Sequence, residues 1–196
     1  MMKSLKKSIK INFFLAASSV FLFSSCASFS LIPGEREVIE KNLASEYFQI
    51  AKGYKDLKNY SKAKEYYEKA LGDSRFHDAA LYEIAVCDVN LKNWEQARKS
   101  FEKLLVKDEN NQNLKMSLAY VDAKRGDLET ASKEYMELVE KYPQDADCIK
   151  NCITVLISKK DYELAEKYLS SMKEKFPKDE SLAKFEKKLE ELKESK

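Results

Sequence analysis

The chain has 196 residues, enough for one or two domains, and its formal net charge is only +2. It holds four glycines and three prolines, whereas 35% of its residues are charged and 44% are hydrophobic. Sheet-rich folds need more turn residues than this, and Lys, Glu and Ala favour helices, so the composition predicts an all-α protein.

The first 25 residues differ from the rest of the chain. The segment MMKSLKKSIK carries four lysines and no acid, and the mainly apolar run Ile11–Phe23 follows it. That run is too short to cross a hydrocarbon core of roughly 30 Å as a helix. A basic segment, a short apolar run and then small residues are typical of an export signal. We therefore predict that residues 1–25 are a signal peptide; the alternative is an uncleaved membrane anchor.

The end of this segment resembles the lipobox of bacterial lipoproteins. Its residues are Leu22-Phe23-Ser24-Ser25-Cys26, with Phe23 where the family more often has Leu. The resemblance implies that Cys26 becomes the N-terminus and carries acyl chains such as palmitate, which bury in the bilayer. Ala27 rather than Asp follows the cysteine, and by Gram-negative sorting rules this favours the outer membrane. Residues 26–34 then form a short lipidated tether that keeps the following domain near the membrane.

Removal of this segment changes the charge balance. The four lysines leave without any acid, so the formal net charge of +2 becomes −2. The remaining lysines alternate with glutamates at helical spacing, which is typical of a solvated helix face. This surface has no basic patch of the kind that binds nucleic acid, so no nucleic-acid partner is expected.

The rest of the chain repeats itself every 34 residues. Leu57–Leu71 reads LKNYSKAKEYYEKAL, and Leu91–Leu105 reads LKNWEQARKSFEKLL. Units that begin at Ala44 cover residues 44–77, 78–111, 112–145 and 146–179. Within each unit, position 20 is alanine: Ala63, Ala97, Ala131 and Ala165.

The pattern within a unit predicts two antiparallel helices. Position 16 holds a short polar residue suited to a turn or a helix cap: Asn59, Asn93, Asp127 and Asp161. Small residues at positions 8 and 20 would let the two helices approach closely, and large residues at positions 4, 7, 11, 17 and 24 would surround that contact. Neither helix can bury its apolar face alone, so neighbouring units must stack.

Both flanks extend this stack. The spacing of Val38, Ile39 and Leu43 predicts that the first helix begins before the first unit, within residues 35–43. Residues 180–196 place Leu182, Phe185, Leu189 and Leu192 on one stripe with charges elsewhere, which predicts a helix that caps the last unit.

The repeat resembles the tetratricopeptide repeat (TPR). The shared features are the A-x₃-F pattern at positions 20 and 24 and a proline near position 32, seen here as Pro143 and Pro177. The resemblance covers residues 44–179. It implies a right-handed TPR superhelix, an α-solenoid, with a TPR domain over residues 35–179 and a C-terminal capping helix.

The resemblance also implies a concave groove, lined by positions 2, 5, 9, 12 and 13 of each first helix. The groove residues carried over in this way are Phe48, Lys52, Lys55, Tyr82, Val86, Val89, Met116, Tyr120, Lys124, Lys150, Thr154 and Ile157. Methionine and tyrosine in a groove suit an amphipathic helix or an apolar peptide. The alternative is that these side chains pack against each other or against the first helix.

One known TPR binding mode does not fit the sequence. Some TPR domains hold the terminal carboxylate of a peptide with a Lys/Asn/Arg arrangement. Here Phe48 and Lys52 occupy positions 5 and 9 of the first unit, and Glu83 occupies position 6 of the second.

The other reactive residue types give little indication of chemistry. Cys87, Cys148 and Cys152 fall at packing positions of the repeat, so we expect buried, reduced thiols; a disulfide or a metal site is the alternative. His77 is the single histidine, and no CxxC pair occurs. No nucleophile motif or phosphate loop is present, so we expect no enzyme activity, metal or cofactor.

The sequence therefore predicts a lipid-anchored TPR scaffold in the bacterial cell envelope, at the periplasmic face or the surface of the outer membrane. Its expected partners are envelope proteins, bound through a peptide or helix in the groove. Two alternatives remain open: an accessory subunit of a periplasmic solute-binding system with an apolar ligand, and a surface-exposed adhesin.

Overall fold

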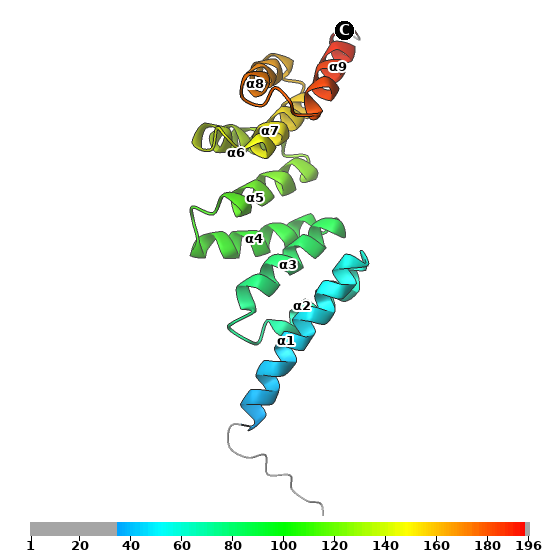
Figure 1. The fold of residues 1–196 in the computed structure, drawn as a ribbon, viewed down its shortest axis with the longest axis vertical. Coiled ribbons are helices and arrows are strands. Elements are labelled where there is room, and N and C mark those ends of the chain that lie inside the picture. The colour runs from blue at the N-terminus through cyan, green and yellow to red at the C-terminus, as the bar shows by residue number, and fades with distance from the viewer. Residues whose placement is uncertain (1–34, 195–196) are drawn as a thin grey trace, which may run out of the picture. The chain divides into compact units, whose positions relative to one another are not determined.

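The structure is a computed structural model that describes the backbone of residues 35–194 and the side chains from Leu43 onward. The predicted signal peptide, the tether and Cys26 lie outside the described residues. Over the described range the chain forms nine α-helices and no strand (Figure 1). They are α1 (Glu35–Asp56), α2 (Tyr60–Ala70), α3 (His77–Asn90), α4 (Trp94–Lys107), α5 (Gln112–Arg125), α6 (Leu128–Lys141), α7 (Ala146–Lys159), α8 (Tyr162–Lys175) and α9 (Ser181–Glu194).

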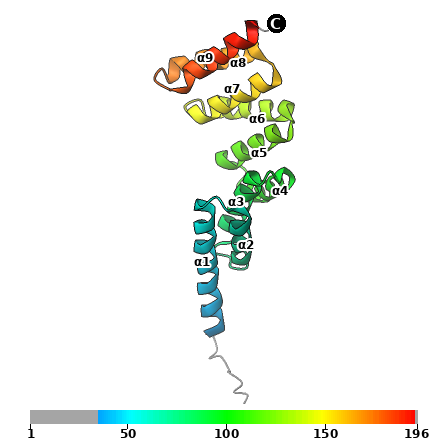
Figure 2. The same cartoon turned by 90° about the vertical axis from the view of Figure 1, so that its right-hand side faces the viewer.

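The chain divides into two units, Met1–Ile39 and Glu40–Lys196, and the second contains the packed helices. From α2 to α9, each helix packs against the next one along the chain, and the first helices α5 and α7 also touch each other. The succession is visible from two sides (Figures 1 and 2). The predicted fold class, an all-α solenoid of helix pairs with a terminal helix, is confirmed.

The turn inside each pair has the same geometry in all four units. Position 15 adopts a left-handed backbone conformation, at Lys58, Lys92, Gly126 and Lys160. The next amide, at position 16, donates to the carbonyl of position 11, as in Asp127 N to Asp122 O at 3.0 Å. This hydrogen bonding closes the first helix in the manner of a Schellman motif.

The short polar residue at position 16 also stands at the N-cap of the second helix. Asn59, Asp127 and Asp161 each accept a hydrogen bond from the backbone amide three residues later. Asn93 instead donates its side-chain amide to Asp88 Oδ1 at 2.9 Å. Three of the four predicted caps are thus present, and Asn93 instead hydrogen-bonds the buried Asp88.

Small residues lie at the contact between helices, as the repeat pattern predicts. The position-20 alanines Ala63, Ala97, Ala131 and Ala165 are fully buried. At position 24, Tyr67, Phe101, Tyr135 and Leu169 are buried one turn further along. A methyl group thus occupies the contact and a large side chain is buried one turn beyond it, which suits a close approach of the two helices.

Position 11, expected to hold a large residue, holds an aspartate in two units. Asp88 and Asp122 occupy it in the second and third units, and each is only 1% exposed. Lys64 Nζ lies 2.7 Å from Asp88 Oδ1, and Arg98 Nε lies 2.9 Å from Asp122 Oδ1. A buried carboxylate is tolerated only with such partners, so two of the interfaces between units contain an ion pair.

The C-terminal helix covers the last unit. Leu189 of α9 is buried, and Leu182 and Phe185 pack against the same apolar cluster as Leu169 of α8. Charged residues occupy much of the rest of the helix, which gives the stack a polar end. None of the described helices is long and apolar enough to cross a membrane.

Candidate peptide-binding groove

The first helices of the second and third units border an open hollow of about 210 Å³. Val86 and Val89 of α3 and Met116 and Tyr120 of α5 line it, four of the residues expected in the groove. The rings of Phe101 and Tyr135, from α4 and α6, also contribute to its lining. The surface is therefore mainly apolar and aromatic.

Tyr120 is the most exposed aromatic side chain at this hollow. It is 40% exposed, and few other large apolar side chains of the described region are as exposed. Lys124 Nζ lies 5.2 Å from the centre of the Tyr120 ring, within range of a cation–π contact. The ring thus presents one face to a cation and leaves part of its surface to solvent.

A hydrogen bond connects two residues that line the hollow. Tyr135 Oη donates to the backbone carbonyl of Met116 at 3.2 Å, which ties α6 to α5. Burial raises the pKa of the Tyr135 phenol well above its usual range, so the proton needed for this bond stays in place. The position of Met116 is consequently determined by the packing of the third unit.

Tyr82, expected to line the groove, is half-buried and packs edge-on against Phe101, with ring centres 5.7 Å apart. Phe48 packs against Tyr67 and Phe76, with ring centres 5.1 and 5.4 Å apart. These two aromatic residues follow the alternative of packing within the solenoid. Ile157 likewise packs against the apolar cluster of the third and fourth units.

The lysines expected in the groove fall into two groups. Lys55 is 2.7 Å from Glu83, and Lys150 is 2.7 Å from Asp147 and 3.6 Å from Asp179. Lys52 and Lys124 are exposed. The structure thus gathers four of the predicted residues around one hollow, with Lys124 beside Tyr120, and places Phe48, Tyr82, Lys55, Lys150 and Ile157 in other contacts.

The sequence pattern did not point to two polar residues at the hollow. Ser117 of α5 and Asn151 of α7 both line it, and both occupy position 6 of their units. Position 6 lies four residues after groove position 2 and three residues before groove position 9, so it falls on the same helix face, and helical spacing alone could have indicated it. Their amide and hydroxyl groups add hydrogen-bonding capacity to an apolar surface.

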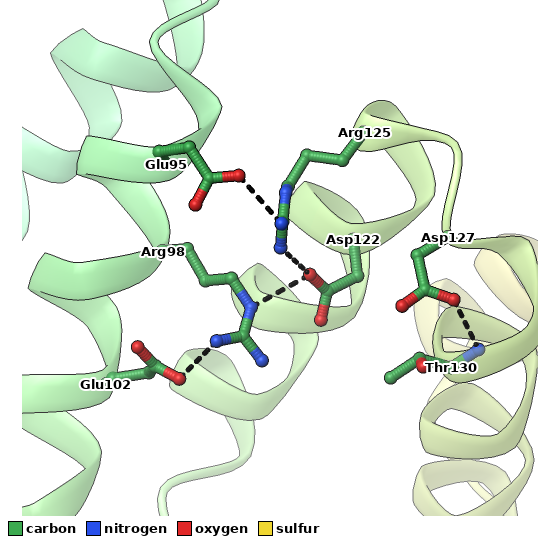
Figure 3. Close-up of polar contacts among 7 residues, drawn as sticks. All are labelled: Glu95, Arg98, Glu102, Asp122, Arg125, Asp127 and Thr130. Carbon is green, nitrogen blue, oxygen red and sulfur yellow. Dashed lines mark hydrogen bonds and ion pairs between the residues drawn. The ribbon is translucent and has the colours of Figure 1, made fainter.

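Ion pairs connect the helices that carry the groove (Figure 3). Asp122 Oδ1 accepts from Arg98 Nε at 2.9 Å and from Arg125 Nη1 at 3.0 Å. Arg125 also reaches Glu95 at 2.7 Å, and Arg98 is paired with Glu102. The network joins α4 to α5 through Oδ1 of Asp122.

Glu134 of α6 is an acid with an unusual environment. Its Oε2 atom is buried without a hydrogen-bond partner among the described residues, as is Oδ2 of Asp122. Burial, and then the negative charge of Asp122, raise the pKa of Glu134 to about 7. This carboxyl is therefore partly protonated near neutral pH.

The three described cysteines are buried and free. Burial raises the pKa of Cys152 to about 12 and that of Cys87 to about 11. Thiolates are the reactive form, so these side chains behave as small apolar packing residues. Within the described residues no group of three or more metal-ligating side chains occurs.

Comparison with known proteins agrees with this geometry. A family model described as "Tetratricopeptide repeat" matches residues 55–119. The helices within this range match the tetratricopeptide repeat, and the whole stack has the TPR fold. A TPR protein from Parabacteroides merdae has 16% sequence identity to the chain and superposes with a TM-score of 0.67, over 79% of this chain and 61% of its own.

Two other solved structures cover most of the described repeats. MamA from Desulfovibrio magneticus RS-1 is 16% identical, with a TM-score of 0.62, over 78% of this chain and 96% of that protein's chain. YrrB, described as a TPR protein with an unusual peptide-binding site, is 22% identical, with a TM-score of 0.56, over 72% of this chain and 74% of its own. At these identities the likeness concerns the TPR fold.

A short stretch resembles a protein of Treponema pallidum (strain Nichols) described as an uncharacterized lipoprotein. The two are 43% identical over 49 residues, which is 24% of this chain and 25% of the other. The match thus spans a quarter of the relative's length.

Proposed function

We propose that the protein is a lipid-anchored TPR scaffold of the bacterial cell envelope, which binds an apolar peptide or amphipathic helix of a partner protein. The observation that carries this proposal is the apolar hollow between α3 and α5, where the exposed ring of Tyr120 lies beside Met116. Exposed apolar side chains gathered on one surface usually mark a binding site, and TPR proteins bind protein partners.

The chemistry of the hollow indicates the kind of ligand. Met116 can adapt its shape to an apolar side chain, and Tyr120 offers a rigid aromatic surface. Lys124 beside that ring favours a ligand with an acidic residue next to its apolar anchor. Lys55 is already paired with Glu83 at 2.7 Å, so this pair does not offer a free cation for a terminal carboxylate.

The size of the hollow bears on the alternative of a small apolar ligand. Pockets for small molecules typically enclose about 300–1,000 Å³, whereas this one is open and measures about 210 Å³. A segment of a partner protein could lie along such a surface without being enclosed. The hollow therefore favours a peptide or helix over a solute.

The anchor part of the proposal is supported by the sequence Leu22–Cys26 and by the lipoprotein relative from T. pallidum. Replacing the cysteine tests it directly. The variant Cys26→Ala should accumulate as an unprocessed precursor and should no longer take up labelled palmitate. Undiminished labelling of this variant would remove the lipid anchor from the proposal.

The groove part can be tested with a photoreactive phenylalanine analogue placed at position 120 in intact cells. Val106 is 78% exposed on α4 and does not line the hollow, so the same analogue at position 106 is the matched control. We expect a cross-linked partner at position 120 that is absent at position 106. The additional change Met116→Ala should weaken its capture by tenfold or more, roughly 1.4 kcal/mol. Equal capture at both positions would contradict binding at this hollow.

A further inference from the structure

A second hollow, of about 280 Å³, lies between α4, α5 and α6, and we call it the α4–α6 hollow. Each of the three helices contributes one leucine to its lining: Leu105, Leu118 and Leu138. Leu118 and Leu138 are buried and Leu105 is half-buried, so this part of the wall is apolar and held by packing. The hollow shares no lining residue with the groove, so it is a separate feature of the molecule.

Charged side chains make up the rest of the lining. Glu134, Glu137 and Lys141 come from α6, and Lys115 comes from α5. Among the described residues, no ion pair joins either glutamate to a lysine. Lys141 Nζ instead donates to Asn110 Oδ1 at 3.1 Å, in the loop after α4. The hollow therefore contains two carboxylates that the cations of the chain itself do not pair.

Glu134 is the deeper of the two acids. It is half-buried, whereas Glu137 is exposed. Oε2 of Glu134 is buried and has no hydrogen-bond partner within the described part of the chain. A buried acceptor without a partner destabilises a fold, and a donor from outside the chain would remove that cost. The unpaired carboxyl group thus indicates that a ligand of this hollow donates hydrogen bonds.

The chemistry of the hollow favours an arginine side chain as that donor. Its methylene groups can pack on the three leucines, because long cationic side chains cover apolar surface with their stems. Its guanidinium group is planar, rich in donors and weakly hydrated, which suits carboxylates partly removed from water. A lysine ammonium is more strongly hydrated, and an anionic ligand would have to approach both Glu134 and Glu137.

We propose that the α4–α6 hollow binds an arginine side chain from an exposed segment of a partner protein, with its guanidinium group on Glu134 and Glu137. The stem of the arginine lies against Leu105, Leu118 and Leu138. This site is separate from the groove, so the proposal depends neither on the groove ligand nor on the lipid anchor. A scaffold with both sites can hold two partner segments at once.

Ionisation of Glu134 makes this binding depend on pH. Burial, and then Asp122, raise the pKa of Glu134 to about 7; Arg98 opposes this rise, and Glu137 and Asp127 add to it. Because the ionised carboxylate attracts the guanidinium group, bound arginine should lower the pKa of Glu134. The ionised fraction of a group with a pKa of about 7 rises from roughly a tenth at pH about 6 to roughly nine-tenths at pH about 8. The affinity should therefore rise by up to about tenfold over that range.

The test is a titration of the purified full-length protein with the peptide acetyl-Ala-Arg-Ala-amide. Binding is followed by calorimetry and by the ¹³C NMR signal of the Glu134 carboxyl group. The matched probe replaces arginine with citrulline, which has a similar shape and no charge. We expect the arginine peptide to bind and to lower the pKa of Glu134, and the citrulline peptide to do neither. Equal binding of the two peptides, or no binding of the arginine peptide, would overturn the proposal.

Variants of the hollow locate the binding site. Glu134→Gln should weaken binding of the arginine peptide by about tenfold or more at pH about 8 and should remove the pH dependence. Removing a buried charge without a partner should stabilise the fold, so this loss of binding cannot be ascribed to unfolding. Glu140 is exposed on α6 and does not line the hollow, so Glu140→Gln is the matched control and should bind as the parent does.

Lys115→Gln tests the sign of the ligand charge. Lys115 lines the hollow, so its removal should strengthen binding of the arginine peptide by reducing repulsion between like charges. Binding that survives Glu134→Gln, that is lost equally in Glu140→Gln, or that weakens in Lys115→Gln would each overturn the proposed arginine site.

Discussion

Arg98 of α4 donates a hydrogen bond of 2.9 Å from Nε to the buried Oδ1 of Asp122 in the next unit. One unit earlier, Lys64 and Asp88 make the equivalent contact at 2.7 Å. One unit later, the same positions hold Ser132 and Leu156, both fully buried. A single repeat geometry thus accommodates a buried ion pair at these positions in two interfaces and a serine beside a leucine in the third, where Lys159 donates to Ser132 Oγ at 3.4 Å.

Ser132 and Leu156, at the interface of the third and fourth units, suggest a pair of substitutions at the interface of the second and third units. Arg98→Ser alone should destabilise the fold by about 2–3 kcal/mol, because the buried Asp122 would keep only Arg125 as a partner. The double variant Arg98→Ser/Asp122→Leu, which copies Ser132 and Leu156, should lie within about 1 kcal/mol of the parent, because apolar replacement of buried ion pairs is often neutral. Urea unfolding monitored by circular dichroism measures both. A double variant weaker than Arg98→Ser would contradict this interpretation.

Ala97 tests the close contact inside a helix pair. It is fully buried where α3 and α4 meet, so Ala97→Leu should cost about 1–3 kcal/mol by overpacking. Ala183 of α9 is exposed, and Ala183→Leu should change the stability much less. Equal melting temperatures for the two variants would argue against a close contact of α3 and α4 at Ala97.

Two tyrosines at the same repeat position should respond oppositely to loss of the hydroxyl. Tyr67 Oη is buried without a hydrogen-bond partner among the described residues, whereas Tyr135 Oη donates to Met116 O at 3.2 Å. Tyr67→Phe should therefore stabilise the fold by about 1 kcal/mol, and Tyr135→Phe should destabilise it by about 1 kcal/mol. Thermal unfolding of the two variants gives the sign of each change in stability. A loss of stability in Tyr67→Phe would count against an unpaired, buried hydroxyl at Tyr67.

Glu134 should make stability depend on pH. Burial, and then the charge of Asp122, raise the pKa of Glu134 from 4.5 to about 7, so the folded state holds this proton more tightly than the unfolded state. The stabilising contribution is complete below pH about 4.5 and is lost as the pH rises through about 7. Glu134→Gln removes this dependence and should stabilise the protein at pH about 8 by roughly 1–2 kcal/mol, after allowance for solvent screening.

The measurement is the difference in unfolding free energy between parent and Glu134→Gln at pH about 5 and about 8. The neighbouring Glu137 is exposed, so Glu137→Gln is the matched control and should show little change. A gain from Glu134→Gln that is as large at the lower pH as at the higher would contradict titration of this carboxyl.

The sequence by itself determined the helical fold and the register of the repeat. Ala63, Ala97, Ala131 and Ala165 recur without insertion, and alanine at a helix crossing and a short polar residue at the following turn act over a few residues. Local geometry of this kind can be read from spacing. The early start of α1 and the capping stripe of Leu182, Phe185 and Leu189 follow from the same periodicity.

Only the tertiary structure decided which side chains stay exposed. Tyr82 and Tyr120 occupy groove positions of adjacent units, yet Tyr82 packs on Phe101 and Tyr120 is 40% exposed. Burial of Asp122 likewise depends on Arg98, 24 residues earlier in the chain. Each outcome is set by a neighbour in another helix or unit, and a repeat pattern states that a position faces inward without stating what it meets there.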